Sequence, residues 1–558
     1  MLPLSASLAL LALLSANPAQ ALWPRPTELK SGTTALRLSS SVSISLPAGA
    51  PSDLKDAVTR TQAQLKGDKF ERLVVGRGAS DAARIKSARE LSKLVLSYGK
   101  GYSATGKSLQ TESTTTLGTR DEGYTLTVPS DGSAATLTAN STLGLFRGLT
   151  TFTQMWYSYD TYTYTAEAPY AITDKPAYPY RGLHLDTARN YFPLSDIKRT
   201  LDAMSWVKLN QFHWHIVDSQ SFPLVVDKYP ELSAKGAYSA SQIYTQQDVK
   251  DIVTYAAQRG IDVMLEIDTP GHTSAIGESH PEYIACRYAP PWATHANEPP
   301  AGQLRLASPT VQKFTADLFS AVLSPLKGFG TLFSTGGDEI NAKCYAEDQP
   351  TQDELKKQGI TIEGALNKFT NVTHAAVRSA GRTPVVWEEM VLDFKVTLPK
   401  DTITLVWISS ANVASVVQKG YRVVHAASDF FYLDCGGGGW VGSNPQGNSW
   451  CDPFKTWQKA YSFDPLNGTT GDQASLILGG QSLLWTEQSD PSNLDPQIWP
   501  RAAAAAEVFW TGGAKRNVTE ALPRLHDVRY RMVQRGVRAI ALQPLWCALR
   551  PYACDLTA

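Results

Sequence analysis

The sequence predicts an α/β protein in which a (β/α)8 TIM barrel follows a smaller α+β domain. The chain has 558 residues, which is too long for one minimal domain and suits a barrel with a companion. From residue 180 onward, eight short apolar segments alternate with amphipathic helical segments. Most of these apolar segments end in acidic, His or Trp residues. Such residues are expected at the carboxyl ends of barrel strands, where active sites are assembled.

Composition and charge exclude several classes of protein. Hydrophobic residues make up 43% and charged residues 19% of the chain, a globular balance that rules out wholesale disorder. The 52 basic and 52 acidic residues give a formal net charge of zero. A neutral chain without a basic stripe is a poor candidate for binding nucleic acid or an anionic membrane. We therefore expect neither partner.

Residues 1–21 have the pattern of a signal peptide. Leu8–Leu14 is an apolar run of suitable length, and Ala19-Gln20-Ala21 is an A-x-A cleavage site, although Lys and Arg are missing before the run. The run is too short to span a bilayer, and no later stretch reaches the roughly 18 apolar residues of a transmembrane helix. We expect cleavage after Ala21 and a secreted, extracellular protein.

Residues 22–176 are predicted to form the α+β domain. They are rich in Ser and Thr and combine strand-like alternation with helical stretches. The segment Ala168–Tyr180 is rich in Pro and Tyr and is predicted to be a linker or domain border. A propeptide would lie within residues 22–100, but no dibasic processing site stands out there. The expected elements are strands at Tyr124–Val128 and Ala135–Thr138 and helices at Leu54–Leu65 and Thr142–Trp156.

Residues 177–540 are predicted to form the barrel, and residues 541–558 a tail closed by a disulfide. Ala502–Ala506 is expected in a buried helix rather than in a biased segment. The expected helices between strands include Asp248–Arg259, Val311–Leu323 and Gly364–Ser379. The expected strands are Tyr180–Asp186, Gln211–Asp218, Ile261–Asp268, Leu332–Glu339, Thr383–Glu388, Ile403–Ile408, Arg422–Ala427 and Leu476–Glu487.

The cysteines and sequons fit an oxidising compartment. None of the six cysteines forms a C-x-x-C pair, so three disulfides are the economical interpretation. Spacing leaves other connectivities open and gives only a preference for local closure. That preference pairs Cys286 with Cys344, Cys435 with Cys451, and Cys547 with Cys554. In a secreted protein, N-x-[ST] triplets are candidate glycan sites, and they start at Asn140, Asn371, Asn467 and Asn517.

Two adjacent carboxylates are the strongest local signal of chemistry. The sequence Gly336-Gly337-Asp338-Glu339 lets the backbone turn tightly at a strand end and presents both carboxylates at the barrel mouth. Adjacent acids repel, so one is expected to hold a proton near neutral pH, which is the property a general acid needs. A solvated acidic turn is the alternative interpretation.

Histidines belong to two of the predicted strand ends. His213 and His215 face one side of a strand, so they are either a metal pair, support for Asp218 at the strand end, or two satisfied buried histidines. A metal needs further ligands, and only His272 is an obvious addition. The Pro270-Gly271 turn swings His272 back over its strand end, where it either orients a carboxylic acid or is a satisfied loop residue. We predict no metal and no cofactor.

Aromatic residues at other strand ends indicate a carbohydrate site. A single Trp at a strand end is more often part of the core. Several that converge on one mouth beside acids and an arginine instead resemble a sugar cage, in which rings stack on the sugar face and polar groups bind hydroxyls. The set consists of Arg181, Trp387, Trp407, Tyr432, Asp434, Trp485 and Glu487.

Together these segments resemble the β-N-acetylhexosaminidases of glycoside hydrolase family 20, most closely the secreted fungal type. The resemblance covers residues 175–540 well and the N-terminal domain loosely. Each motif alone is moderately specific, but six in the same order are very specific. The motifs are Tyr180–Tyr191, His213–Asp218, Asp268–His272, Gly336–Glu339, Trp485–Glu487 and Trp499–Arg501, and Tyr432–Gly436 also has a fungal counterpart.

The resemblance implies an exo-acting, retaining enzyme that removes terminal GlcNAc or GalNAc from chitooligosaccharides or glycans. The substrate's own 2-acetamido oxygen is the nucleophile in this family. Glu339 would be the general acid/base, while Asp338 and Tyr432 would hold the acetamido group. Asp218 and His272 would tune Glu339. The residues expected to bind the sugar are Arg181, Trp387, Trp407, Asp434, Trp485 and Glu487.

The chain departs from its relatives at two positions, and two other functions stay open. Many relatives have His in place of Ser334 and Asp in place of Ser219, which we expect to affect pH optimum and aglycone preference. The other functions are a barrel metallohydrolase that uses His213 and His215, and a carbohydrate-binding protein without activity. The intact pair Asp338 and Glu339 argues against a carbohydrate-binding protein without activity. The expected partner is an oligosaccharide or glycoconjugate substrate, and a homodimer is left open.

Overall fold

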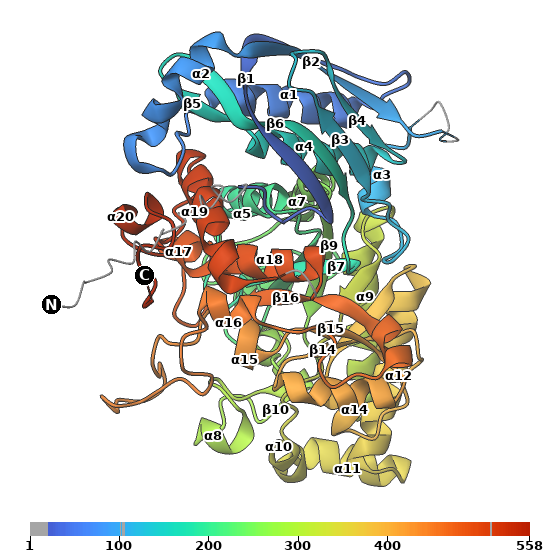
Figure 1. Ribbon diagram of the computed structural model, residues 1–558. Helices are drawn as coiled ribbons and strands as arrows, with labels where there is room; N and C mark the ends of the chain where they lie inside the picture. Colours follow the sequence, from blue (N-terminus) through green and yellow to red (C-terminus); the bar gives the residue numbers. More distant parts are fainter. Residues whose placement is uncertain (1–20, 101, 103–105, 514–515, 558) are drawn as a thin grey trace, which may run out of the picture.

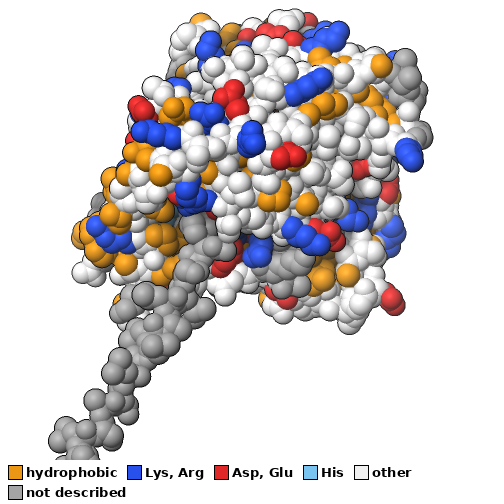
Figure 2. All heavy atoms as spheres, turned by 45° about the horizontal axis from the view of Figure 1, so that its top comes forward, with side chains coloured by type: hydrophobic (Ala, Val, Ile, Leu, Met, Phe, Trp, Pro, Cys, Tyr) orange, Lys and Arg blue, Asp and Glu red, His pale blue; other side chains and the backbone are white. Residues whose placement is uncertain are grey.

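The computed structural model describes residues 21–100, 102, 106–513 and 516–557. The predicted signal peptide, apart from Ala21, lies outside these described residues. An N-terminal sheet lies across one end of a barrel, away from the loops that carry α8 (Trp292–His295) and α10 (Ala342–Glu347) (Figure 1). Within the described part of the chain, every helix is too short or too polar to cross a membrane. Figure 2, with the N-terminal region turned forward, shows acidic and basic side chains scattered over the surface.

The N-terminal region is a six-stranded sheet in the order β1-β2-β4-β3-β6-β5, in which β1 also pairs with β6. Alternate residues of β3 and β4 are buried, as their sequence alternation predicts. The linker prediction for Ala168–Tyr180 is wrong as far as Asp174, because β6 continues to that residue in pairing with β1 and β3. The strands are β1 Glu28–Ser45, β2 Arg89–Tyr98, β3 Tyr124–Val128, β4 Ala135–Ala139, β5 Tyr157–Tyr159 and β6 Tyr162–Asp174.

Two helices, α1 (Ser52–Gly67) and α4 (Thr142–Gln154), connect the sheet to the barrel. The Ser141 side chain accepts the Gly144 N–H and caps α4. Arg60 of α1 donates to the carbonyl of Gln258 at 2.9 Å, and Arg147 of α4 donates to the carbonyl of Gly260 at 2.7 Å. Both carbonyls follow α7, so both helices are fixed to the same edge of the barrel. The short helices here are α2 Ala82–Ser87 and α3 Leu109–Ser113.

A buried ion cluster joins the N-terminal region to the amino ends of the barrel strands. Glu122 accepts from Arg147 at 2.8 Å and from Arg181 at 2.5 Å, and its other oxygen accepts from Asn210 at 3.1 Å. Glu122 and both arginines are buried. Burial alone would raise the pKa of Glu122, but the two guanidiniums lower it to about 2. The cluster therefore holds an ionised carboxylate between two cations.

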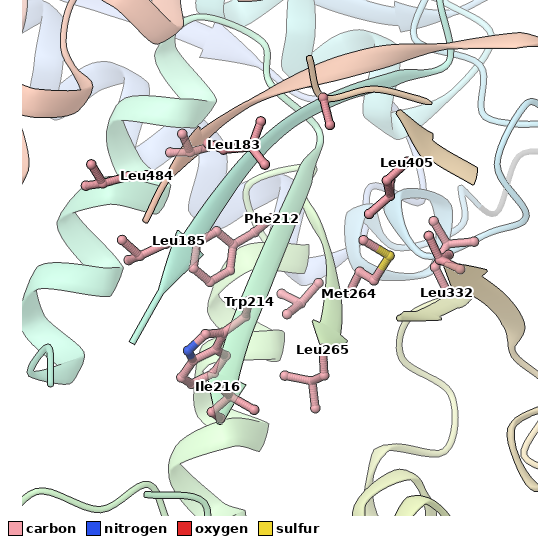
Figure 3. Packing of buried hydrophobic residues seen from close by; sticks show 14 of the residues in the cluster. Leu183, Leu185, Phe212, Trp214, Ile216, Met264, Leu265, Leu332, Leu405 and Leu484 are labelled. Carbon is pink, nitrogen blue, oxygen red and sulfur yellow. The ribbon is translucent and has the colours of Figure 1, made fainter. Parts of the chain in front are cut away.

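The barrel consists of eight parallel strands that close on themselves in the order β12-β13-β14-β15-β16-β7-β8-β9. Phe212, Trp214 and Ile216 project from one face of β8 into the apolar core (Figure 3). Strand alternation leaves His213 and His215 on the opposite, inner face. The strands are β7 Tyr180–Asp186, β8 Gln211–Val217, β9 Asp262–Ile267, β12 Leu332–Ser334, β13 Thr383–Trp387, β14 Ile403–Val406, β15 Arg422–His425 and β16 Ile477–Leu484.

The helices around the barrel follow the sequence prediction closely. One connection between strands contains only a very short helix. Between β13 and β14 there is only the single-turn helix α13 (Glu389–Leu392). Residues 502–506 are buried in α18, as expected. The main helices are α5 Leu194–Trp206, α7 Gln246–Ala257, α9 Pro309–Leu323, α11 Gln349–Gln358, α12 Ile362–Ser379, α14 Val413–Gln418, α16 Trp457–Tyr461, α18 Arg501–Thr511, α19 Val518–Gln534 and α20 Leu545–Ala548.

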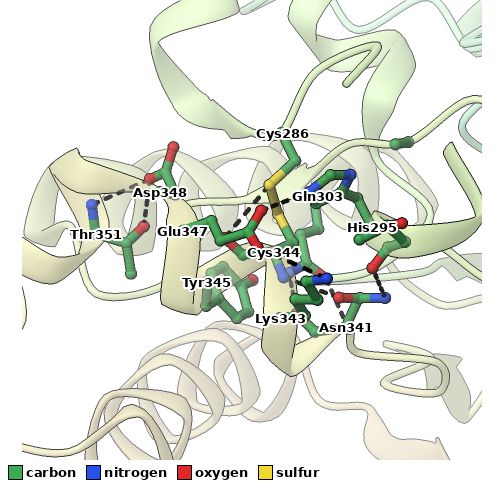
Figure 4. Close-up of a disulfide and its surroundings, with 12 residues drawn as sticks. Cys286, His295, Gln303, Asn341, Lys343, Cys344, Tyr345, Glu347, Asp348 and Thr351 are labelled. Carbon is green, nitrogen blue, oxygen red and sulfur yellow. Dashed lines mark hydrogen bonds and ion pairs between the residues drawn. A yellow bond between two sulfur atoms is a disulfide. The ribbon is translucent and has the colours of Figure 1, made fainter. Parts of the chain in front are cut away.

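All three predicted disulfides are confirmed: Cys286–Cys344, Cys435–Cys451 and Cys547–Cys554. The first ties the loop after β10 (Ile284–Ala285) to α10, where the Asn341 side chain caps the helix by accepting the Cys344 N–H at 2.8 Å (Figure 4). The second closes a glycine-rich loop beside Tyr432. The four sequon asparagines, Asn140, Asn371, Asn467 and Asn517, are exposed.

We expect Glu122→Gln to lower the free energy of unfolding by about 3–5 kcal/mol, because it leaves two buried guanidiniums without their counter-charge. Urea denaturation monitored by Trp fluorescence measures this. Since the folded-state pKa of Glu122 is depressed, its contribution is present above about pH 4.5 and is lost as the pH falls toward about 2. The exposed Glu90→Gln is the matched control, and an equal loss in both variants would contradict the interpretation.

Candidate active site

A cavity of about 340 Å³ opens where the carboxyl ends of the barrel strands meet. Carboxylates, aromatic rings and one arginine line it together. Most of the sequence-predicted site residues contribute to this lining, although they come from separate strand ends. Those in the lining are His272, Asp338, Glu339, Trp387, Trp407, Tyr432, Asp434, Trp485 and Glu487.

The acid pair stands in a tight turn that Asp268 holds in place. The structure ends β12 at Ser334, so the turn lies beyond the strand and not inside it. Gly336 has φ +65°, and a Cβ there would lie 1.8 Å from the Asp268 Oδ1 atom. The Gly337 N–H donates to the same oxygen at 2.8 Å. The two glycines therefore let the chain approach the end of β9 closely.

Glu339 is aimed at His272 by an unusual backbone. Both residues have positive φ, +53° for Glu339 and +54° for His272, which is costly for side chains with a Cβ. The His272 Nε2 atom lies 3.3 Å from the Glu339 carboxylate, and the Nδ1 atom lies 3.2 Å from Asp218 Oδ1. The strain thus places an imidazole between two carboxylates.

The surroundings of this cluster favour a proton on His272 over one on Glu339. Burial alone would raise the pKa of Glu339, but the hydrogen bond and charge of His272 hold it below its ordinary value. Burial would lower the pKa of His272, but Asp218 and Glu339 raise it well above the usual range. Glu339 can therefore become a proton donor by receiving the Nε2 proton of His272.

Asp338 faces the cavity, and the cation nearest to it is His272, whose Nε2 atom lies 3.9 Å from Asp338 Oδ2. The side chain of Asp338 is buried, and its Oδ1 atom has no hydrogen-bond partner among the described residues. Burial and the neighbouring charge of Asp268 raise the pKa of Asp338 well above its usual value. Of the two adjacent acids, Asp338 is thus the one whose protonated form its surroundings favour. A ligand that brings an N–H group or positive charge to this carboxyl would favour its ionised form.

Aromatic rings form the walls of the cavity. Trp387 is fully buried, and its ring centroid lies 6.1 Å from that of Trp485. Trp407 is nearly parallel to Tyr432, with 12° between the rings and 6.4 Å between the centroids. The indole N–H of Trp407 donates to Glu389 at 2.9 Å, which fixes that ring. A flat apolar ligand face fits such walls.

The carboxylates Asp434 and Glu487 and the arginine Arg189 also line the cavity. Burial raises the pKa of Asp434 to about 7, and burial also raises that of Glu487 well above its ordinary value. The Arg189 guanidinium lies 4.9 Å from the centroid of the Trp485 ring and 3.0 Å from Asp218 Oδ2. Such groups can accept from and donate to ligand hydroxyls.

The expectation that Arg181 binds a sugar is wrong. Arg181 stands near the amino end of β7, is fully buried and binds Glu122 at the opposite end of the barrel. The arginine in the cavity is Arg189, which follows the carboxyl end of the same strand. The rule that active-site groups lie at the carboxyl ends of barrel strands distinguishes Arg189 from Arg181. Trp292 of α8 also lines the cavity, as do residues outside the helices and strands that no sequence pattern predicted: Asn297, Glu298, Trp440, Trp450 and Gln488.

The His213 and His215 pair is engaged by carboxylates. His213 Nε2 lies 2.9 Å from Glu266, and His215 lies 2.5 Å from Glu266 through Nδ1 and 2.7 Å from Asp218 through Nε2. The His272 ring lies on the far side of Asp218. The ring nitrogens of both histidines thus have hydrogen-bond partners, and His215 supports Asp218 directly.

Comparison with known proteins identifies the relatives of this chain. The family described as "Glycosyl hydrolase family 20, catalytic domain" matches residues 178–513, and "beta-acetyl hexosaminidase like" matches residues 22–155. A beta-hexosaminidase of Arthroderma benhamiae is 38% identical over 454 residues, covering 78% of this chain and 74% of the relative. The chitooligosaccharidolytic beta-N-acetylglucosaminidase of Ostrinia furnacalis is 34% identical over 548 residues, covering 94% and 88%. The chitobiase structure from Flavobacterium johnsoniae superposes with TM-score 0.74 at 26% identity, covering 93% and 74%.

We expect Gly336→Ala to destabilise the fold far more than Gly359→Ala. Both glycines have nearly the same φ, +65° and +64°, but nothing lies within 4 Å of a Cβ at Gly359. The control therefore carries only the backbone cost of about 1–2 kcal/mol, whereas Gly336→Ala must also displace Asp268. Denaturant unfolding of both variants measures the difference, and equal losses would mean that the turn is not held as described.

Proposed function

This chain belongs to glycosyl hydrolase family 20, and from that premise we propose that it is an exo-acting, retaining β-N-acetylhexosaminidase that uses substrate-assisted catalysis. It is a glycoside hydrolase with beta-hexosaminidases among its relatives. The observation that carries the proposal is the pair Asp338 and Glu339. One carboxyl faces an aromatic cavity, and its neighbour lies 3.3 Å from the Nε2 atom of His272. Such a pair can serve two roles at once, charge stabilisation and proton transfer.

The reaction proceeds in two steps that Glu339 serves as acid and then as base. In the first step, the acetamido oxygen of the substrate bonds to the anomeric carbon while the glycosidic bond breaks. Glu339 gives its proton to the departing oxygen. In the second step, water bonds to the anomeric carbon, Glu339 takes a proton from that water, and the bond to the acetamido oxygen breaks. Two displacements at one carbon retain its β configuration.

Asp338, Tyr432 and the tryptophans are assigned to the acetamido group. The unpartnered Oδ1 atom of Asp338 is suited to accept the acetamido N–H, and the ionised carboxylate stabilises the positive charge that develops on this nitrogen. Tyr432 is buried in the wall beside Trp407 and can donate to the acetamido oxygen. Trp387 and Trp485 keep water from the reacting atoms.

The remaining lining groups select the terminal sugar. Arg189, Asp434 and Glu487 are polar groups beside the aromatic rings of the wall, and we assign them to the hydroxyls of a non-reducing GlcNAc or GalNAc. Chitooligosaccharides and glycans are the substrate classes that carry such ends. The three disulfides support secretion, since disulfides persist in oxidising compartments. The exposed sequon asparagines are then available for glycans.

We expect Glu339→Gln to lower turnover of chitobiose by about 10²–10⁴-fold, because its leaving group depends on protonation. Turnover of an activated aryl β-GlcNAc glycoside should fall much less. Steady-state kinetics with both substrates measures this, and Glu282→Gln, at an exposed glutamate, is the control. Equal losses for the two leaving groups would remove Glu339 from the acid role.

We expect a thiazoline analogue of GlcNAc to bind roughly 10²-fold or more tightly than GlcNAc, as mimics of a charged intermediate do. Asp338→Asn should weaken this inhibitor and slow turnover together, by about 10²–10³-fold, since both depend on the same charge. Inhibition constants and kcat for the variant, with the exposed Asp131→Asn as control, measure this. Cleavage of β-glucosides at comparable rates, or a sugar bonded to a carboxylate, would refute substrate assistance.

A further inference from the structure

Behind the cavity, the inner face of the barrel carries a chain of buried polar side chains. Tyr180, Gln481, His213, Glu266 and His215 are all fully buried. The two histidines pack against the cavity walls, His213 at 5.8 Å from the Trp387 ring and His215 at 4.9 Å from the Trp485 ring. Burying polar groups is costly unless each finds a partner. Nothing in the proposed reaction uses these residues directly, so their arrangement needs a physical reason.

The direction of the hydrogen bonds fixes the proton of His213. The Tyr180 hydroxyl donates to the Gln481 Oε1 atom at 2.6 Å, so the amide nitrogen faces His213 and donates to its Nδ1 atom at 3.1 Å. His213 must then carry its proton on Nε2, which donates to Glu266 at 2.9 Å. The Ser334 hydroxyl donates to the same carboxylate oxygen. Glu266 thus receives two donors on one oxygen and is held as an anion.

His215 is held as a cation between two carboxylates. Its Nδ1 atom lies 2.5 Å from Glu266 and its Nε2 atom lies 2.7 Å from Asp218. Two acceptors require a proton on each ring nitrogen. Burial opposes this charge, but the hydrogen bonds to both carboxylates raise the pKa of His215 to about 10.

We propose that Glu266 is a positioning residue for the general acid, acting through His215 and Asp218 on the proton shared by His272 and Glu339. The inference rests on the acid role proposed for Glu339. Glu266 keeps His215 charged, and the charged ring, together with Arg189, balances the Asp218 anion. A balanced Asp218 attracts the His272 ring less strongly. The Nε2 proton of His272 can then pass to Glu339, 3.3 Å away.

Removing the Glu266 charge makes the transfer of the proton from His272 to Glu339 less favourable. In Glu266→Gln, His215 faces only one carboxylate and becomes neutral, although its Nε2 proton still binds Asp218. The uncompensated Asp218 then favours the doubly protonated His272, and Glu339 is protonated less often. Glu266 is absent from the cavity lining, so substrate binding is unaffected. The expected signature is a loss of kcat that grows as the leaving group becomes poorer.

A double-mutant cycle tests the proposal. Glu266→Gln in the wild-type background should lower kcat for chitobiose about tenfold, a part of the roughly 10²–10⁴-fold effect of a positioned acid. Its kcat for an activated aryl β-GlcNAc glycoside, and both KM values, should change less than about twofold. In the Glu339→Gln background, Glu266→Gln should cause no further loss, because residues acting on one path are not additive.

Two further variants distinguish the proposed effect on the general acid from a general loss of stability or folding. Glu122→Gln neutralises an equally buried, ion-paired carboxylate at the other end of the barrel, so it should lower stability without changing leaving-group dependence. If Glu266→Gln does not fold, His215→Gln replaces it, since its amide still donates to Asp218 but carries no charge. Equal losses for both substrates, or the same loss in the Glu339→Gln background, would overturn the proposal. Wild-type chitobiose turnover in Glu339→Gln alone would instead refute the proposed function.

Discussion

The alternation of negative and positive groups from Glu266 through His215, Asp218 and His272 to Glu339 is the interaction on which the site depends. Glu266, His215 and Asp218 are buried, whereas His272 and Glu339 are partly exposed to the cavity. A charge shielded from water is tolerated only when a partner of opposite sign lies within hydrogen-bond distance. Neighbouring members of the series lie 2.5–3.3 Å apart. The spacing leaves little freedom, so the strands that carry these groups must keep one register.

The loops at the barrel mouth are built to satisfy that constraint. The turn at Gly336 approaches the end of β9 so closely that Asp268 accepts the Gly337 N–H. His272 and Glu339 both adopt left-handed backbones, and the surrounding hydrogen bonds offset that strain. The backbone of the mouth is thus strained at the two residues to which the proton transfer is assigned. Strain at a site held by a rigid scaffold is typical of catalytic residues.

The two ends of the barrel use buried charge for different purposes. At the amino ends, Glu122 is enclosed by Arg147 and Arg181, and the carboxylate fastens the N-terminal region to the barrel. At the carboxyl ends, Asp338 has an unpartnered oxygen that faces an open cavity. A satisfied carboxylate is structural, whereas an unsatisfied one beside solvent is available to a ligand. Arg181 and Arg189 belong to one sequence motif, yet Arg181 binds Glu122 at the amino end of the barrel and Arg189 lines the cavity at the carboxyl end.

The sequence by itself determined the barrel, its eight strands and the identity of the acid pair, because these follow from local periodicity and from the rule that strand ends carry chemistry. Local spacing also identified the three disulfides correctly. Arg181 lies near the amino end of β7 and Arg189 follows its carboxyl end, so strand polarity predicts that only Arg189 reaches the cavity. Only the tertiary structure decided that β6 extends to Asp174 and that loop residues such as Trp450 reach the cavity. It alone decided that His213 and His215 bind Glu266, because those contacts join residues distant in sequence whose distances depend on how the barrel closes.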